Sequence, residues 1–504
     1  MDDTTRIGSS VLPSVERVKK RVEQMYNWDV SSLNLAPDEV VTYWVEVYDN
    51  DFITGPKLAR SKEYAIRLPS IEEIVEQVAQ ESEAQTKDFL RAIEEEKKLI
   101  EESKKFSQEL LGKEELKWED KQKATEFVKK QEEIAEKLTK LSEDMTKTLE
   151  NLEKNALVAG EIVEKIQEIQ RILEDIMTPE LREAIKRIRE ALESMDPNLL
   201  RSAMRQFQQN LEELLNKLDQ TLSLLKRVQI EQKLESLTKL ASKLKEEQDK
   251  INEALKSSTL SQDSLNKLAS AEDKINKGIE NLKENLKELS DAMREFPDIP
   301  GDILDGVISD LEKGEVQYHA SMASNNMRGD NPKGAYKEGE KVSEGISGLI
   351  SGLNSAMQGL QMSVKKEILD AMRNAISALF YTSNLTEERY LSIDPSLLDD
   401  KMLMYEADIT NRINEGLKNI LDDLYDIGGK TFLLSPVVGA LVSKARESLA
   451  NSVKQLSSRN AIGARAGIMD ALVFENAAID ELLRSMEKKQ KKTFLNIIYT
   501  SDFQ

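Results

Sequence analysis

Residues 127–176 read FVKKQEEIAEKLTKLSEDMTKTLENLEKNALVAGEIVEKIQEIQRILEDI. Apolar side chains recur in this stretch at alternating intervals of four and three positions, and the frame continues from Phe127 to Ile176. A spacing that averages 3.5 residues keeps one stripe of a helix turned toward a neighbouring helix. The stretch therefore predicts one continuous helix of roughly 75 Å, at about 1.5 Å per residue, that packs lengthwise against other helices.

A second frame of the same kind follows Asp196-Pro197, a pair that is typical of a helix start. Long helices joined by short turns fold back on one another most economically. We therefore expect residues 69–295 to form an elongated coiled-coil region, either a long antiparallel hairpin or a three-to-four-helix bundle, and a parallel homodimer is the competing arrangement. The predicted packing seam consists of Ile134, Leu138, Leu141, Met145, Leu152, Ile162, Ile166, Ile169, Leu173, Leu211, Leu215, Leu218 and Leu222.

The composition is typical of a mainly α-helical protein with a solvated outer face, because 32% of the residues are charged and 5% are aromatic. The formal net charge of -21 argues against binding to nucleic acid, since a phosphate backbone attracts clusters of Lys and Arg. The chain contains no cysteine, which excludes disulfides and thiol chemistry. It also contains no run of about 18 apolar residues, so no membrane span is predicted.

Residues 1–68 follow a different pattern. Apolar and polar residues alternate from Val41 to Val47 and from Tyr64 to Leu68, which is the period of two expected of strands. We expect a third strand over residues 22–28. Two or three strands cannot bury a face by themselves. We therefore interpret this segment as part of a β-sandwich, which either docks on the helices or is completed by strands outside this chain.

Residues 296–333 are predicted to be a boundary region with short helices, because two prolines lie between Phe296 and Gly301. Residues 334–504 predict a C-terminal helical bundle rich in small side chains. One of its helices has a nearly bare face suited to close packing, formed by Gly345, Gly348, Gly352 and Gly359. We expect further helix boundaries at residues 383–384, 393–395, 428–429 and 435–436, and final helices over 437–457 and 460–488.

One short stretch has the residue types of a metal site. Asp49, Asn50 and Asp51 carry the oxygen ligands that calcium prefers. The same residue types also favour tight turns between strands, and the spacing of an EF-hand is absent. We therefore interpret this stretch as a turn, with a cation site as the alternative. No cofactor is predicted.

Other chemical motifs are incomplete. Gly428-Gly429-Lys430-Thr431 contains the Gly-Lys-Thr of a phosphate-binding loop, but Leu424 occupies the place of its first glycine. His319 is the only histidine, which excludes a multi-histidine metal site within one chain. The abundant carboxylates are typical of solvated helix faces with Glu–Lys pairs. We therefore predict no catalytic residues.

Several motifs between residues 28 and 74 resemble those of a known group of proteins. WDVSSL at 28–33, VTYWVEVYDND at 41–51 and RLPSIEEI at 67–74 are similar to large, uncharacterised, membrane-anchored envelope proteins of Bacteroidota. In that group, immunoglobulin-like strands precede a long helical region. The resemblance implies that residues 1–68 are the last strands of an immunoglobulin-like sandwich, and that the chain is a fragment of a periplasmic or cell-envelope protein anchored through a longer parent. It brings no catalytic residues.

These observations favour a non-catalytic structural or scaffolding protein, which acts as an elongated helical spacer and binds protein partners, or a second copy of itself, through helix packing. The alternative is a binding module whose C-terminal bundle docks a partner helix. An enzyme with an unrecognised carboxylate site is the third hypothesis.

Overall fold

The computed structural model describes residues 27–28, 30, 40–49, 51, 53, 55–67, 69–256, 260–296, 299, 301–393, 400–432 and 434–501. Within its helices, the side chains of residues 362–365, 367, 436 and 488–501 are outside the description. The chain divides into two units, Met1–Ile74 and Val75–Gln504. The predicted mainly helical class is confirmed, with a small β element in the first unit. No helix in the described ranges combines the length and the apolar character needed to cross a membrane.

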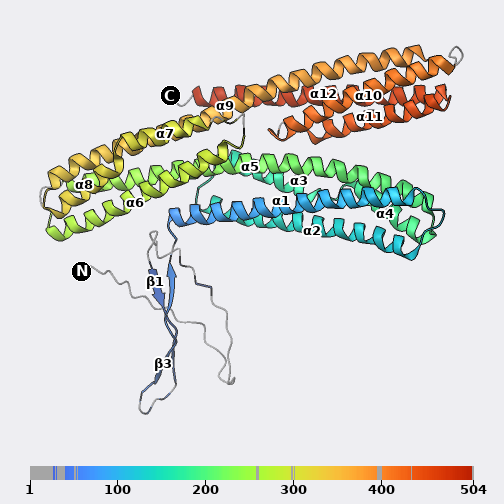
Figure 1. Ribbon diagram of the computed structural model, residues 1–504. Coiled ribbons are helices and arrows are strands. Elements are labelled where there is room, and N and C mark those ends of the chain that lie inside the picture. The colour runs from blue at the N-terminus through green and yellow to red at the C-terminus, as the bar shows by residue number, and fades with distance from the viewer. Residues whose placement is uncertain are drawn as a thin grey trace. The chain divides into compact units, whose positions relative to one another are not determined.

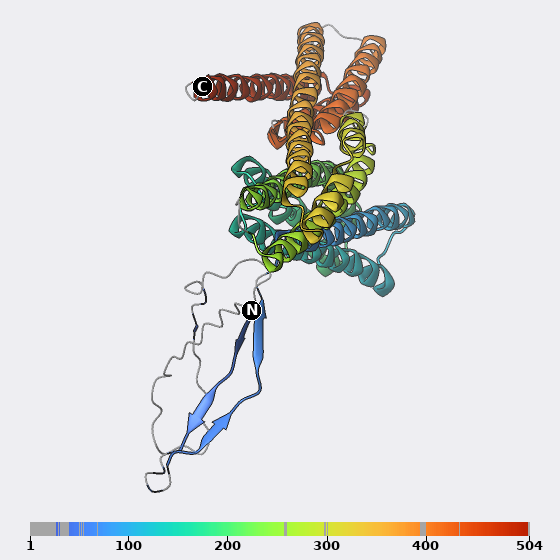
Figure 2. The ribbon, with the colours of Figure 1, turned by 90° about the vertical axis from the view of Figure 1, so that its left-hand side faces the viewer.

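The first unit contains two short antiparallel ribbons, which Figure 2 shows one after the other. β1 (Val40–Tyr43) pairs with β4 (Tyr64–Arg67), and β2 (Glu46–Tyr48) pairs with β3 (Leu58–Arg60). Between the ribbons, residues 44–45 face residues 61–63, so one strand has an extra residue, as in a β-bulge. The single strand predicted over residues 41–47 is therefore interrupted. Most of the strand predicted over 22–28 lies outside the described residues, and Trp28 is not in a strand.

The second unit begins with five helices. They are α1 (Ile71–Leu110, which starts in the first unit), α2 (Trp118–Lys154), α3 (Gly160–Glu174), α4 (Pro179–Ser194) and α5 (Pro197–Leu255). A capping box opens α1: the Glu73 amide donates to Ser70 Oγ over 3.2 Å, and the Ser70 amide donates to Glu73 Oε2 over 3.3 Å. Helices α1 and α2 run in opposite directions, since Glu95 pairs with Lys137 and Glu102 pairs with Lys130.

The continuous helix predicted over residues 127–176 is wrong. Helix α2 ends at Lys154, where Ala156 has a left-handed φ of 53° and the Leu157 amide donates to the Leu152 carbonyl over 2.9 Å. This is the hydrogen bond of a Schellman cap, formed here without the usual glycine. Helix α3 then folds back along α2, because the Gln170 side chain donates to Thr146 Oγ1 over 3.0 Å. The apolar frame from Phe127 to Ile176 is therefore divided between two helices.

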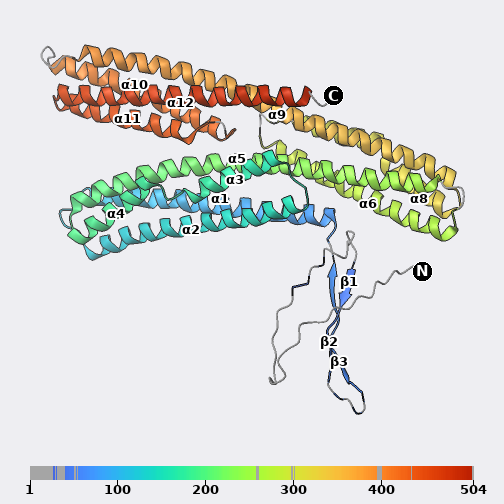
Figure 3. The same ribbon diagram turned by 180° about the vertical axis from the view of Figure 1, so that it is seen from behind.

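Helix α5 is a single helix of 59 residues. The spacing of its apolar residues shifts by one position between Leu225 and Ile230, and the helix continues through this shift. Helix α4 packs along the first half of α5 and α3 along its middle, as far as Glu231 and Glu235 (Figure 3), and α6 (Gln262–Met293) packs along its second half. The predicted start at Asp196-Pro197 is confirmed, because the Asp196 side chain accepts from the Asn198 and Leu199 amides.

The remaining helices are α7 (Asp302–Lys313), α8 (Val316–Arg328), α9 (Pro332–Ser392), α10 (Asp400–Gly428), α11 (Pro436–Ser457) and α12 (Ala461–Ser501). Helix α9 runs for 61 residues, first beside α7 and α8 and then beside α10 and α12 (Figure 1). The boundary predicted at residues 383–384 is wrong, because α9 continues through them. Within this helix, the Ser383 hydroxyl donates to Asn476 Oδ1 of α12 over 3.1 Å. The boundaries predicted at 393–395, 428–429 and 435–436 coincide with helix ends.

Candidate binding groove in the C-terminal helices

Asp49 and Asp51, for which a turn was predicted and a cation site was the alternative, lie in the loop between β2 and β3. Asp49 Oδ1 accepts the amides of Asp51 and Lys57 over 3.3 and 2.8 Å, and Asp51 Oδ1 accepts the Ile53 amide over 3.0 Å. Both carboxylates are thus used to stabilise the loop between β2 and β3, while Asn50 lies outside the described residues. Within the part of the chain that the structure describes, no three His, Asp or Glu side chains are grouped so that they could hold a metal ion.

The other two motifs have structural surroundings that do not match their chemistry. Gly428 ends helix α10, and Lys430 Nζ lies 2.9 Å from Asp426 Oδ2, whereas a phosphate-binding loop follows a strand. His319 on α8 lies with its Nδ1 2.6 Å from Glu338 Oε2 on α9. It is therefore part of a contact between two helices.

The predicted seam residues are in the core. Of the thirteen, eleven are buried, and Leu215 and Leu222 are partly buried against the same cluster. This cluster extends over α1 to α5 as one hydrophobic core. A second core lies among α9, α10, α11 and α12. The seam is therefore a packing surface, and it is closed within one chain.

The close packing predicted for the glycine face of α9 is confirmed for Gly345, Gly352 and Gly359, which contact α7 or α8, and is wrong for Gly348. A Cβ atom added to Gly345 would lie 2.3 Å from Val316 Cγ2, and one added to Gly352 would lie 2.8 Å from Val307 Cγ2. Gly348 on the same helix is exposed, with no atom within 4 Å of its Cβ position.

Alanine substitutions at Gly352 and Gly348 should change the free energy of unfolding in opposite directions. Gly352→Ala should lower the free energy of unfolding by about 1–3 kcal/mol, because the added methyl overpacks a filled contact. Gly348→Ala should raise it by up to about 1 kcal/mol, because alanine is the better helix former. Thermal unfolding followed by circular dichroism measures both. A stabilising Gly352→Ala would contradict the close contact between α9 and α7.

Among the residues that the structure describes, three carboxyl groups have no exposure to solvent. Burial raises the pKa of Glu96 on α1 to about 8, and it raises the pKa of Glu272 on α6 and of Glu475 on α12 to about 7. Gln248 donates to Glu272 over 3.0 Å, and Thr386 donates to Glu475 over 3.0 Å. These buried carboxyl groups were not predicted from the sequence. Gln131, a polar residue in the apolar frame, was the available signal, because it is fully buried opposite Glu96.

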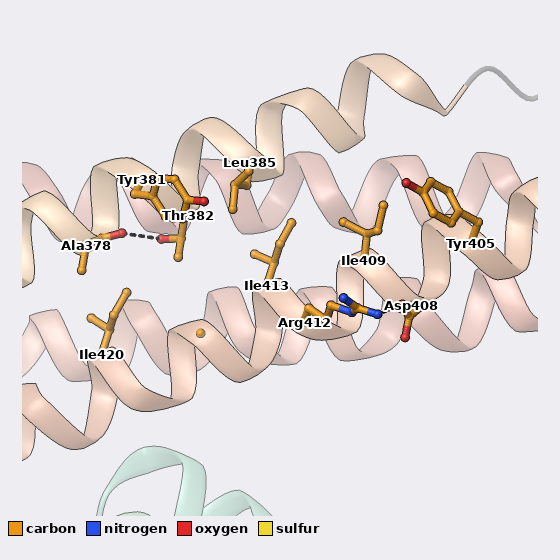
Figure 4. A pocket seen from close by; sticks show the side chains of 11 residues that line it. Ala378, Tyr381, Thr382, Leu385, Tyr405, Asp408, Ile409, Arg412, Ile413 and Ile420 are labelled. Carbon is orange, nitrogen blue, oxygen red and sulfur yellow. Dashed lines mark hydrogen bonds and ion pairs between the residues drawn. The ribbon is translucent and has the colours of Figure 1, made fainter.

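A groove of about 540 Å³ lies between α9 and α10 (Figure 4). Its walls are mainly aliphatic, and Leu385, Ile413 and Ile420 project into the space between the two helices. The full lining is Ala378, Tyr381, Thr382, Leu385, Tyr405, Asp408, Ile409, Arg412, Ile413, Gly416 and Ile420. The groove lies within the predicted C-terminal bundle, but its residues were not predicted.

Aromatic side chains remain exposed beside this groove. Tyr381 is 66% exposed and Tyr405 is 63% exposed, although both line the hollow. The nearby Met404 on α10 is 72% exposed. Tyrosine and methionine are enriched at protein interfaces, where they supply contact area. The groove therefore has the composition of a docking surface.

Gly416 keeps the groove open. A Cβ added there would lie 3.8 Å from Thr382 Cγ2, which is an ordinary contact distance. A larger side chain at this position would therefore fill the space without moving the backbone. An interior glycine in an otherwise helical sequence was the signal that could have predicted the groove.

No chemistry beyond binding is supported by this site. Its charged lining residues are Asp408 and Arg412, which pair with each other over 2.7 Å and are both exposed. Comparison of the chain with protein-family models, with curated proteins and with solved structures found no match.

Proposed function

We propose that this protein is a non-catalytic structural or scaffolding protein, in which long helices hold successive groups of packed helices at fixed separations. The observation that supports this proposal most strongly is the continuity of α5 and α9. Each is one helix, and each packs first against one set of neighbours and then against another. A helix that is shared in this way leaves no flexible linker at the joint.

The lengths of these helices suit a spacer. At about 1.5 Å per residue, α5 and α9 extend roughly 88 and 92 Å for their 59 and 61 residues. Because the chain reverses at Ala156, residues 127–176 do not form a long spacer helix. The two long helices α5 and α9 support the spacer function instead. The assignment to the cell envelope is based on the resemblance of residues 28–74 to envelope proteins.

Small-angle scattering from the full chain tests the spacer. A compact chain of this size has a radius of gyration of about 23 Å. We expect a clearly larger value and a maximum dimension of at least about 90 Å, because α9 alone is that long. A radius of gyration near the compact value would contradict the spacer function.

A second function is supported by a separate observation. The groove between α9 and α10 is open to solvent and mainly apolar, with a volume of about 540 Å³. Amphipathic helices bind in grooves of this kind through residues at positions i, i+3, i+4 and i+7. We infer that the C-terminal helices bind a partner helix in addition to their role in the spacer.

A further inference from the structure

The Gly428-Gly429 pair has a structural role that its partial match to a phosphate-binding loop does not explain. Gly428 is the last residue of α10, and this end of α10 lies against α5, where the Gln220 side chain donates to the Tyr425 carbonyl over 3.0 Å. A Cβ atom added to Gly428 would lie 3.1 Å from Gln220 Nε2. A Cβ atom added to Gly429 would lie 3.4 Å from Ser223 Cβ. The two glycines therefore let the end of α10 approach α5 closely.

The turn that follows α10 contacts both hydrophobic cores. Phe432 packs against the first core, whose other members among the described residues all lie between Phe89 and Val228. Leu434, two positions further along the same turn, packs against the second core, which is formed by α9 to α12. The turn therefore joins two cores that are built from separate parts of the chain.

From these contacts we propose that Tyr425, Gly428, Gly429 and Phe432 form a clasp, a conformational device that holds helices α10 to α12 in a fixed position against α5. Along the chain these helices are connected to the preceding ones through α9, and a long helix can bend. The clasp is a second connection across the fold, made by an aromatic side chain, a hydrogen bond and the close glycine contacts. Its release frees α10 to α12 to move relative to α5 while both cores stay intact.

Distances measured across the clasp test this proposal. The chain contains no cysteine, so Arg182→Cys on α4 and Lys454→Cys on α11, both at exposed positions, accept two spin labels in the full chain. Double electron–electron resonance should give one narrow distance distribution for the doubly labelled chain. Phe432→Ala should broaden this distribution at least about twofold, because opening of a part of the structure requires less free energy once its apolar contact is lost.

Two further variants distinguish release of the clasp from unfolding. Gly429→Leu keeps the Phe432 ring but places a side chain against Ser223, so it should broaden the distribution as well. Leu434→Ala is the matched control, because Leu434 lies in the same turn and packs against the second core. It should leave the distribution narrow. Circular dichroism checks that each variant keeps the helical content of the original chain.

Three results would overturn the clasp. The first is a broad distribution in the labelled chain without further substitutions, which would show that α10 is not held against α5. The second is a narrow distribution in a folded Phe432→Ala variant. If that variant loses helical content, a narrow distribution in Gly429→Leu decides against the clasp instead. The third is equal broadening in Leu434→Ala, which would show that the contact with the first core does not hold these helices. None of these results changes the lengths of α5 and α9, so the spacer function still depends on its own scattering test.

Discussion

Replacing Glu96 by glutamine should stabilise the packing of α1 at neutral and alkaline pH. Glu96 is completely buried, and neither of its carboxyl oxygens has a hydrogen-bond partner among the described residues. Burial raises its pKa from the ordinary value of 4.5 to about 8, and the neighbouring Gln131 offsets this only in part. The folded protein therefore holds this carboxyl group neutral at pH 7, whereas the unfolded chain ionises it.

The sign of the pH dependence follows from this difference. Between pH 4.5 and about 8, unfolding releases a proton, so the free energy of unfolding falls as the pH rises. Each pH unit in this window lowers it by about 1.4 kcal/mol. Below the window the contribution of the neutral group is fully present, and above it the loss is complete.

Glu96→Gln should remove this pH dependence. At pH 8 we expect the variant to be more stable than the original chain by about 3–5 kcal/mol, and at pH 5 by less than about 1 kcal/mol. Hydrogen exchange of the α1 and α2 amides measures this locally, because it reports the opening of individual helices. Glu94→Gln, at an exposed position on the same helix, is the matched control and should change neither value.

Truncation of a leucine in the predicted seam should strongly lower the free energy of unfolding. Leu138 on α2 is completely buried in the core formed by α1 to α5. Leu138→Ala should lower the free energy of unfolding by about 2–5 kcal/mol, through lost burial and the cavity left behind. Denaturant unfolding followed by circular dichroism gives the change.

Leu90→Ala on α1 is the control for this loss. Leu90 is 39% exposed, so its truncation should cost less than about 1 kcal/mol. If both substitutions had the same small effect, the seam would not be the core of this helix group.

The sequence predicts the helical elements well because their apolar frames are long. The frame through Leu138 and Leu152 identifies a face that is buried in the structure, and the proline-containing starts at Asp196 and Ser435 coincide with the caps of α5 and α11. The β alternation around Tyr64 likewise corresponds to a strand.

The failures have local physical causes. The apolar frame passes through Ala156 unchanged, so it could not reveal a chain reversal that depends on one residue with positive φ. Conversely, Ser383 and Asn384 are typical of a helix end, but Ser383 is buried against α12 and the helix continues. In both places the packing of distant segments decides whether the helix ends or continues. The pattern of neighbouring residues alone does not predict that packing.

The groove could not be predicted for a related reason. Its walls come from two separate helices, α9 and α10, and the space between them depends on how these helices pack (Figure 4). Tyr381 and Tyr405 have no sequence pattern that distinguishes exposed aromatic residues from core residues. Their exposure is a property of the packed structure.

The continuity of α5 can be measured directly, because the chain contains no cysteine and two spin labels can be placed without background. Gln209→Cys and Lys250→Cys put labels at exposed positions on the two halves of α5. For an unbroken helix, double electron–electron resonance should give one narrow distance distribution near about 60 Å, at 1.5 Å per residue. A broad distribution, or one centred well below this distance, would show that α5 bends or breaks between its two sets of neighbours and would contradict the spacer account.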